Sequence, residues 1–435
     1  MQQRQQLQNR EQLLSVAEPW LSRRRTALDL VERTLAGLDP YAATLESLRE
    51  VFPRGQATEA SEFVVVSLGK AAPQMARSAL EHLAPASGFV LSPAPPSGLA
   101  PLVELTGSHP IPSADAPAHA ERILTHLRAL DSRHQLVFLI SGGGSSLLEL
   151  PRGGLTLRDL SLTSERLMHA GADIQTLNVV RRALSRVKGG GLLRASGTAR
   201  VTNFILSDVV GGPLYAVASG PTLPVIEPPQ SAWQILTDFG VRDALPAAVH
   251  ALLSSSPPTP EHAATPATWL VADNDRGVRL LREQASELGV ALEGLPVPLR
   301  GEAASVGERL ARRIATSPSP RGLVGGGETT VTINAAMSGA GGRNQELILG
   351  AARAALETGR FPGTLVSFGT DGIDGQSTAA GALLDQALLS RLDASSVAEA
   401  LARHDSHTLL QQSNAALLSG ATGTNVADLL FWLPD

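Results

Sequence analysis

The sequence predicts an α/β protein of two domains, each a sheet covered by helices. Short apolar segments alternate with amphipathic ones, beginning with residues 62–69 and 70–83. Such alternation is typical of a mostly parallel sheet with helices on both faces. The length of 435 residues supports more than one domain, at roughly 150 residues for each. Residues 254–268 are rich in Pro, Ser, Thr and Ala, which marks them as the predicted linker.

Each helix and strand is predicted from the spacing of its apolar residues. Before the linker, helices are expected at 26–38, 41–52, 70–83, 118–130, 157–171 and 174–191, and strands at 62–69, 88–93, 102–107, 135–140 and 200–208. After it, the pattern restarts with a strand in 268–275 and a helix at 277–289, followed by further α/β elements at 322–333, 344–359 and 364–375. We expect an N-terminal domain over 1–255 and a C-terminal domain over 266–435, with the last helix packed back on the first domain as an open alternative.

Composition favours small-molecule partners. The net charge of -5 comes from 36 basic and 41 acidic residues with no long block of one sign, which argues against nucleic-acid or membrane partners. The absence of cysteine excludes disulfides, thiolate nucleophiles and Cys-ligated zinc. The N-terminal stretch lacks the apolar segment of a signal peptide, and no apolar run approaches the ~18 residues of a membrane span. We therefore expect a cytoplasmic protein.

Glycines gather in six clusters, most of them directly after a predicted strand. Ligands of open α/β sheets bind at the carboxyl ends of strands, where backbone amides and helix N-termini favour anions. Each cluster alone is explained equally well by a tight turn, but six together favour phosphate binding. The clusters are at 142–144, 189–191, 211–212, 325–327, 339–342 and 369–375.

Two cations support the same interpretation. Lys70 and Arg343 each stand at the predicted start of a helix, where the dipole makes a cation unfavourable by roughly 0.3 to 1 kcal/mol. A bound anion would offset that cost; the alternative is a helix that begins a few residues later. A third basic group, at the predicted end of a helix, needs no anion, because the dipole favours cations there. It comprises Arg181, Arg182, Arg186 and Lys188.

Carboxylates for phosphoryl chemistry follow predicted strands. Asp208, Glu328, Asp371 and Asp374 are the candidates to bind a metal or to accept a hydroxyl proton. Turn chemistry before glycine explains Asp374 equally well. His109 is a weaker candidate, since a histidine beside proline is more often a loop residue.

Several signatures are missing. Val64 stands where a GxxxxGK[ST] motif ending at Lys70 would need its first glycine, so a P-loop is not predicted. Leu147 and Asn344 replace the last glycine of GxGxxG in the two best matches, which argues against a dinucleotide-binding dehydrogenase. GxSxG is also absent, so Ser145 and Ser146 make poor hydrolase nucleophiles.

A series of motifs resembles the glycerate 2-kinase family, whose C-terminal half is called MOFRL and whose members are often labelled hydroxypyruvate reductases. They are GKAAPQMA, SHPIP, LISGGGSSLLELP, GADIQTLNVVRRALSRVKGGGL, LSDVVGG, ASGPT, GEAASVG, GGGETTVT, GGRNQEL, GTDGIDG, AAGA and TGTNVADL, and they span almost the whole chain. The resemblance implies transfer of phosphate from ATP to D-glycerate, giving 2-phosphoglycerate, with Mg²⁺ or another divalent cation. It also implies a cleft between a larger Rossmann-like domain and a smaller MOFRL-type domain.

The resemblance assigns the central catalytic roles to Lys70 and Arg343, the same two cations that the dipole argument selects. Arg343 is expected to bind either the transferred phosphoryl group or the glycerate carboxylate. Asp208 is the third catalytic candidate and, with Asp371, a candidate metal ligand. Nucleotide contacts are expected from Ser141, Gly142, Gly143, Gly144, Ser145, Ser146, Lys188, Gly189 and Ser207, and substrate contacts from Asn344, Glu328, Asp371, Gly372 and His109.

The sequence departs from the family pattern at three places. Gly212 replaces a usual acidic residue, Ser113 replaces a usual Asp, and SGATGTNV replaces a usual TGPTGTNV. The first change puts the details of metal or donor binding in doubt. An NAD(P)H-dependent reductase and a non-catalytic sensor of sugar acids or nucleotides are the alternatives, and the oligomeric state, a homodimer included, stays open.

Overall fold

The computed structural model describes residues 7–54, 62–225, 229–254, 265–316, 321–333 and 339–435. The chain forms two compact units, one of residues 40–271 and the other of residues 1–39 together with 272–435. The two units therefore divide the chain differently from the expected domains, because the segment before residue 40 packs with the C-terminal part. Most of the predicted linker, residues 255–264, lies outside the described residues.

The unit of residues 40–271 is built on an all-parallel six-stranded sheet, which confirms the predicted sheet type. Its strand order is β3-β2-β1-β4-β5-β6, so the chain starts near the middle and moves out in both directions. Long apolar runs form these strands because helices cover both faces. The strands are β1 (Glu62–Leu68), β2 (Ser87–Ser92), β3 (Val103–Thr106), β4 (His134–Ile140), β5 (Arg200–Leu206) and β6 (Ala267–Ala272).

Strand β6 corrects one expectation. It follows the predicted linker and was expected to begin the second domain, yet it is the edge strand of the first sheet beside β5. Its continuous apolar run over residues 269–272 indicates a strand, but no local pattern says which sheet that strand joins.

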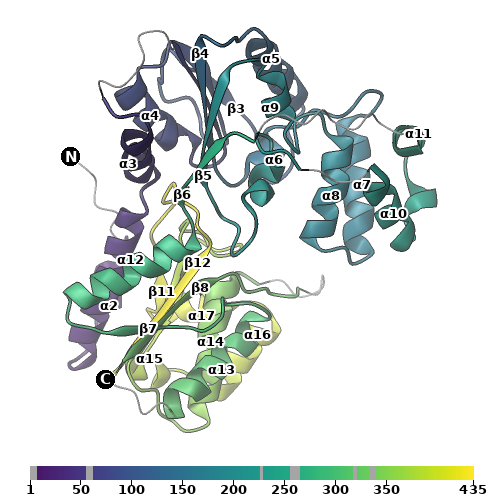
Figure 1. Ribbon diagram of the computed structural model, residues 1–435. Coiled ribbons are helices and arrows are strands. Elements are labelled where there is room, and N and C mark those ends of the chain that lie inside the picture. The colour runs from purple at the N-terminus through teal and green to yellow at the C-terminus, as the bar shows by residue number, and fades with distance from the viewer. Residues whose placement is uncertain (1–6, 55–61, 226–228, 255–264, 317–320, 334–338) are drawn as a thin grey trace. The chain divides into compact units, whose positions relative to one another are not determined.

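Helices α3 (Pro40–Val51) and α4 (Ala72–Leu83) lie on one side of the first sheet, with α5 (Ala116–Arg128) and α9 (Gly191–Ala195) on the other (Figure 1). Short helices α6 (Gly144–Leu147) and η1 (Leu214–Ser219) contact each other near the strand ends. A further group of helices has its own apolar core. It consists of α7 (Leu157–His169), α8 (Ile174–Leu184), α10 (Pro229–Asp238), η2 (Arg242–Ala244) and α11 (Ala247–Ser254).

The other unit contains a mixed six-stranded sheet of order β11-β10-β9-β12-β8-β7. Its central strand β12 is the last element of the chain and runs antiparallel to both neighbours. The strands are β7 (Leu292–Gly294), β8 (Gly322–Gly327), β9 (Thr364–Gly369), β10 (Gly381–Leu384), β11 (Ala416–Leu417) and β12 (Asp428–Leu433).

The last helix of the chain, α17 (Ser406–Gln412), packs within this unit and not on the first domain. Its neighbours are α14 (Arg343–Leu356), α16 (Ala394–Ala402) and β11.

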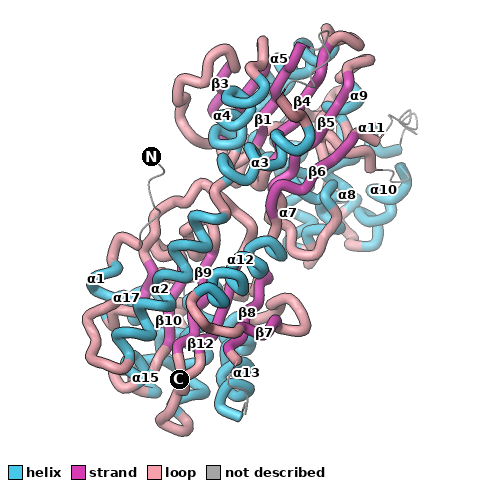
Figure 2. The backbone as a smooth tube through the Cα atoms, turned by 60° about the vertical axis from the view of Figure 1, so that its left-hand side comes forward, coloured by secondary structure: helices cyan, strands magenta, loops and turns pink. Residues whose placement is uncertain are grey.

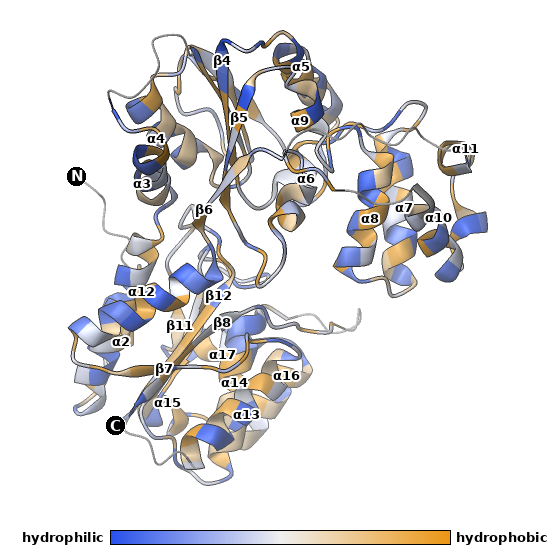
Figure 3. Ribbon diagram, viewed as in Figure 1, coloured by the Kyte–Doolittle hydropathy of each residue, from blue (hydrophilic) through white to orange (hydrophobic). Residues whose placement is uncertain are grey.

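Helices α2 (Trp20–Gly37) and α12 (Asn274–Glu287) pack on one face of the mixed sheet, and α14 packs on the other face beside α13 (Ala303–Thr316) (Figure 2). Helices α1 (Arg10–Leu13) and α15 (Gln386–Leu389) complete the unit. The strands of this sheet are largely apolar and α12 is largely polar (Figure 3), as expected for a sheet covered by amphipathic helices. Among the described residues, no helix has both the length and the apolar character to cross a membrane.

A buried ion pair ties helix α2 into this unit. Arg24 on α2 donates to both carboxylate oxygens of Asp385, at 2.6 and 2.9 Å, and neither side chain is exposed. Arg24 also donates to the carbonyl of Leu13, and Asp385 caps α15 by accepting from the backbone of Leu388. These contacts hold α2 and Leu13 to the C-terminal part of the chain.

Replacing Arg24 by Met should lower the free energy of unfolding by about 3–5 kcal/mol, because it leaves the Asp385 carboxylate buried and uncompensated. Urea unfolding followed by circular dichroism measures the loss. Arg23→Met is the matched control on the same helix, since Arg23 pairs with a half-exposed Asp435 and should cost at most about 1 kcal/mol. Equal losses in the two variants would contradict the importance of the buried pair.

Candidate active site

Four loops of the parallel sheet carry the predicted residues of the first unit. Because parallel strands end at the same edge, the loops after β1, β3, β4 and β5 come together there. They contain Lys70, His109, the Ser141–Ser146 segment and Asp208. The order of the strands, and not their spacing in the sequence, therefore assembles this part of the site.

The backbone at Gly142 and Gly143 lies among three polar side chains. A β-carbon at Gly142 would lie 1.9 Å from Oδ2 of Asp208, and one at Gly143 would lie 3.1 Å from Cγ of Lys70 and 3.2 Å from Cδ2 of His109. The φ of Gly143 is +81°, which favours glycine. The structure thus brings Lys70, His109 and Asp208 together around the glycine loop.

Gly144 has a different reason to be glycine. A β-carbon there would lie 2.7 Å from Cβ of Ala218 and 3.0 Å from Cγ of Leu68, so this residue packs against the apolar core. The helix that follows, α6, is one turn long, which makes its dipole a weak source of anion binding. Of the three glycines, only the first two have polar side chains at this distance.

Hydrogen bonds hold the loops to one another. The amide of Lys70 donates to the carbonyl of Gly142 at 2.9 Å, and the amide of Ala71 donates to Oγ of Ser141 at 3.1 Å. Ser145 and Ser219 share a hydrogen bond of 2.9 Å between their hydroxyls, and Oγ of Ser146 donates back to Gly143. Most of these bonds involve backbone, so they persist when the Lys70 side chain is changed.

Lys188 and Ser207, two of the predicted nucleotide contacts, make hydrogen bonds or ion pairs within the protein. Gly189, the third, follows Lys188 in the same loop. The Lys188 ammonium is buried and donates to the carbonyl of Ser145 at 2.6 Å while pairing with Glu149 at 3.0 Å. Helix α8 ends at Leu184, four residues before Lys188, so this lysine lies in a loop and not in the predicted helix end. Ser207 makes hydrogen bonds within the loop after β5, to Val209. These contacts give Lys188 and Ser207 a role in holding the loops.

His109 and two of the three departures from the family pattern lie in loops of this sheet, with His109 and Ser113 after β3 and Gly212 after β5. Desolvation lowers the pKa of His109, and the neighbouring Lys70 charge lowers it further. The hydroxyl of Ser113 is buried without a hydrogen-bond partner among the described residues. Gly212 is half-buried, and a β-carbon there would lie 2.5 Å from Cγ1 of Val209.

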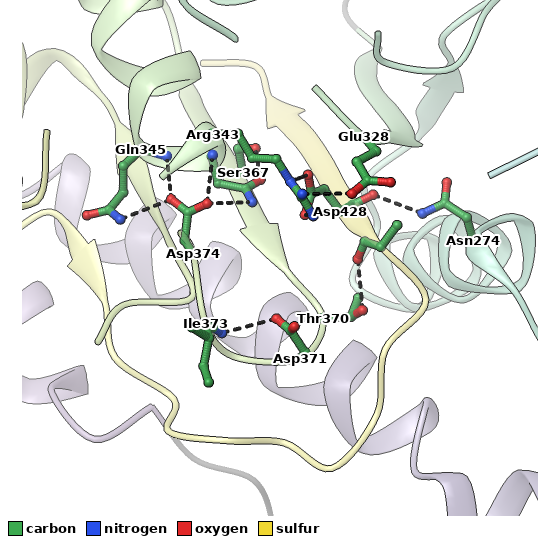
Figure 4. Close-up of polar contacts among 12 residues, drawn as sticks. Asn274, Glu328, Arg343, Gln345, Ser367, Thr370, Asp371, Ile373, Asp374 and Asp428 are labelled. Carbon is green, nitrogen blue, oxygen red and sulfur yellow. Dashed lines mark hydrogen bonds and ion pairs between the residues drawn. The ribbon is translucent and has the colours of Figure 1, made fainter. Parts of the chain in front are cut away.

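In the other unit, Arg343 is the first residue of α14 and is held by two carboxylates (Figure 4). Its Nε and Nη2 donate to the two oxygens of Asp428 at 2.5 and 3.0 Å, and its Nη1 donates to Glu328 at 2.7 Å. Burial alone would lower the pKa of Arg343, but the two carboxylates outweigh burial and raise it. Arg343 is therefore a charged group with a fixed orientation.

Asp428 is a functional candidate that the sequence did not single out. It is almost fully buried at the start of β12, and its carbonyl accepts from the Asn274 side chain at 2.9 Å. Burial raises the pKa of Asp428 to about 6 although Arg343 opposes the shift. The sequence signal that could have identified it is an aspartate immediately before the last apolar segment of the chain.

Asp374 caps the start of α14. It accepts from the backbone and side-chain nitrogens of both Asn344 and Gln345, at 2.9 to 3.2 Å. Burial raises the pKa of Asp374 against the effect of these bonds. The dipole argument expected an external anion at this helix end, whereas here the protein supplies its own carboxylates.

The remaining substrate candidates lie at the same end of the mixed sheet. Asn344 is buried, and its carbonyl oxygen accepts from Ser367 at 2.6 Å. A β-carbon at Gly369 would lie 3.4 Å from an oxygen of both Asp371 and Asp428, so these two carboxylates share the end of β9. Asp371 accepts from the amide of Ile373 at 3.1 Å, and Gly372 has a φ of +84° in the same turn. Glu328, Asp371 and Arg343 are thus brought close, whereas Asn344 points inward.

The glycines of β8 do not support the phosphate interpretation. A β-carbon at Gly326 would lie 2.0 Å from Oδ1 of Asn274, and one at Gly325 would lie 2.5 Å from Leu295. The 325–327 cluster is therefore part of a strand that packs closely against its neighbours.

The carboxylate of Asp208 fits a Mg²⁺ ion whose other ligands are phosphate oxygens and water. Within the described residues, no three His, Cys, Asp or Glu side chains form a metal-binding cluster. Mg²⁺ in phosphoryl-transfer sites needs only one or two carboxylates, because water and phosphate supply the other ligands. Asp208, whose carboxylate fills the space that a side chain at Gly142 would take, meets that requirement.

Comparisons with known proteins identify the family of the chain. Residues 26–254 match a domain of unknown function called DUF4147, and residues 322–428 match the MOFRL family. The D-glycerate 2-kinase of Thermotoga maritima is 32% identical over 95% of this chain and 98% of its own length, and the glycerate 2-kinase of Pyrococcus horikoshii is 33% identical over 94% and 96%. A crystal structure of glycerate kinase from Thermotoga maritima superposes with a TM-score of 0.84 at 31% identity, covering 94% of this chain and 99% of that one. The chain belongs to the glycerate kinase family, with a DUF4147 and a MOFRL domain.

Proposed function

We propose that the protein transfers the γ-phosphoryl group of ATP to the 2-hydroxyl of D-glycerate, giving ADP and 2-phosphoglycerate. The observation that carries the proposal is the grouping of Lys70, His109 and Asp208 around the backbone of Gly142 and Gly143. That grouping provides a cation that can offset phosphate charge and a carboxylate that can hold a metal, both beside the glycine backbone. Membership of the glycerate kinase family and the names of its relatives supply the substrate.

In the reaction, the 2-oxygen of glycerate forms a bond to the γ-phosphorus while the bond from that phosphorus to the β–γ bridging oxygen breaks. Lys70 neutralises charge on the transferring group, which is the usual part of a cation in phosphoryl transfer. Asp208 would hold Mg²⁺, which shares the phosphate charge when it is bound. Asp371 orients the glycerate hydroxyl and takes its proton.

The structure favours one of the two roles considered for Arg343. Arg343 uses three of its five N–H groups on Asp428 and Glu328, which leaves one N–H on each terminal nitrogen for the two oxygens of a carboxylate. The planar guanidinium also suits a carboxylate geometrically. We therefore assign Arg343 to the glycerate carboxylate.

³¹P NMR of the protein with D-glycerate, ATP and Mg²⁺ tests the proposal, because it reports transfer and regiochemistry together. The expected result is equal growth of the ADP and 2-phosphoglycerate signals. A 3-phosphoglycerate signal would keep the kinase and overturn the position of transfer. Unchanged ATP in a folded, Mg²⁺-supplied sample would overturn the kinase; NADH oxidation by hydroxypyruvate, followed at 340 nm, would then test the reductase alternative.

A further inference from the structure

The glycine loop of residues 339–342, directly before α14, is held by hydrogen bonds from two sides. On one side, the amide of His407 donates to the carbonyl of Ala340 at 2.9 Å. On the other side, the amide of Gln376 donates to the carbonyl of Gly341 at 3.0 Å. The backbone that leads into α14 is therefore fixed before the helix begins.

Close packing fills the space around this loop. A β-carbon at Gly341 would lie 2.2 Å from Oγ of Ser406, and one at Gly342 would lie 2.4 Å from Cγ of Asp374. Both positions need glycine, because neighbouring side chains occupy the space that a β-carbon would take. This cluster therefore does not support the phosphate interpretation; it lets two segments of the chain pack against the start of α14.

Asp374 determines the orientation of the Gln345 side chain at that helix start (Figure 4). Oδ2 of Asp374 accepts from the backbone and side-chain nitrogens of Gln345, both at 2.9 Å. The same side-chain nitrogen also donates to Oγ of Ser377 at 2.8 Å, and that hydroxyl donates its own hydrogen to the carbonyl of Asp374. Both hydrogens of the Gln345 carboxamide are thus used, which leaves its Oε1 as an acceptor.

That acceptor faces His407. Oε1 of Gln345 lies 2.9 Å from Nδ1 of His407, and both side chains are buried. A carboxamide oxygen only accepts, so Nδ1 of His407 carries the hydrogen of this bond. Desolvation lowers the pKa of His407, although Asp405 and Asp374 oppose the shift. The ring is therefore neutral at neutral pH, and its Nε2 carries no hydrogen.

We propose that His407, as the neutral tautomer with its hydrogen on Nδ1, is a positioning residue for Arg343. Its ring bonds to Gln345, two residues after Arg343, and its amide bonds to Ala340, three residues before it. The backbone is thus held on both sides of the arginine, while Asp428 orients the guanidinium itself. The inference rests on the proposed function, in which Arg343 binds the glycerate carboxylate.

Long-range ¹H–¹⁵N correlation NMR of the wild-type protein, labelled with ¹⁵N at histidine, reads the tautomer directly. At neutral pH, His407 should show a protonated Nδ1 and an unprotonated Nε2, and the loss of its signals in His407→Asn assigns them. A hydrogen on Nε2 with a bare Nδ1 would overturn the inference. Because this measurement is made on the wild-type protein, it decides even where a second variant fails to fold.

Variants of His407 test the positioning role through the KM for D-glycerate. His407→Leu leaves the buried Oε1 of Gln345 without a donor, so this KM should rise about fivefold or more while the KM for ATP stays unchanged. His407→Asn places a carboxamide nitrogen near the position of Nδ1 and should restore the wild-type KM. Arg403→Gln is the matched control, since it alters an exposed side chain of the same turn, paired with Glu399, and should change neither constant.

Thermal unfolding separates positioning from a structural role. Wild-type constants in a folded His407→Leu variant would overturn the inference. A lower melting temperature with both KM values raised alike would give His407 a structural role and overturn it too, as would a His407→Asn variant that behaves like His407→Leu.

Calorimetric titration with D-glycerate, without ATP, distinguishes failure of this inference from failure of the proposed function. A wild-type protein that transfers no phosphate, yet binds D-glycerate more tightly than His407→Leu does, would refute the kinase and leave the positioning role standing. A wild-type protein that neither binds nor phosphorylates D-glycerate would overturn both. An active kinase in which His407→Leu binds D-glycerate as tightly as the wild type would refute the positioning role alone.

Discussion

Lys70→Met is expected to reduce kcat/KM by about 10³-fold or more, the range for a cation that stabilises a transferring phosphoryl group. Methionine keeps most of the length of the side chain and removes its charge. The fold should persist, since the backbone amide of Lys70 still donates to Gly142 and the loop keeps its bond from Ala71 to Ser141. A coupled assay for ADP measures the loss, and circular dichroism checks the fold.

The composition of the chain offers an independent check. Only two of the 36 basic residues are lysines, Lys70 and Lys188, and the second is buried in its pair with Glu149. An amine reagent such as acetic anhydride should therefore modify Lys70 and the N-terminus, and ATP should protect Lys70 alone. Near wild-type activity in Lys70→Met, or labelling of Lys70 that ATP does not slow, would contradict its assignment.

The first sheet could be predicted from the sequence because buried parallel strands are apolar runs that alternate with amphipathic helices. Strand β6 shows where this reasoning stops, since its residues identify a strand but not the sheet that it joins. Strand β12 was missed altogether. Six apolar or buried residues at the chain end do not reveal that they form the centre of the second sheet, because the pairings with β8 and β9 are long-range.

The candidate site shows the same division between local and long-range information. Cations at predicted helix starts are a local signal, and it selected Lys70 and Arg343. Arg343 is the first residue of α14, whereas α4 begins only at Ala72, so for Lys70 the alternative of a later helix start is correct. The carboxylate that orients Arg343 lies 85 residues further along the chain, beyond the reach of any local pattern. The glycine clusters were ambiguous for a different reason: Gly326 packs closely against the Asn274 side chain, whereas Gly143 has a φ of +81° and lies beside Lys70 and His109, and only the neighbouring atoms distinguish the two cases.

Asp428→Asn should lower kcat by up to about 100-fold, the cost of a small displacement of a group that must be aligned. Asp428 acts through Arg343, which it positions through two hydrogen bonds. If Arg343 holds the glycerate carboxylate, the KM for glycerate should rise and the KM for ATP should stay unchanged. Glu357→Gln, which removes a carboxylate from the exposed pair with Arg312, is the control and should alter neither constant.

The pH profile separates positioning from a merely structural role. Because burial raises the pKa of Asp428 to about 6, Asp428 is ionised and paired with Arg343 above that pH, and wild-type activity should fall as the pH drops through 6. The folded protein binds this proton more tightly than the unfolded chain does, so the group's contribution to stability is present below its ordinary pKa and is lost as pH rises through about 6. As the pH falls from 7 to 5, activity should therefore fall while the contribution of Asp428 to the free energy of unfolding rises. In Asp428→Asn the acid limb near pH 6 should disappear, whereas an unchanged limb in the folded variant would assign that titration to another group.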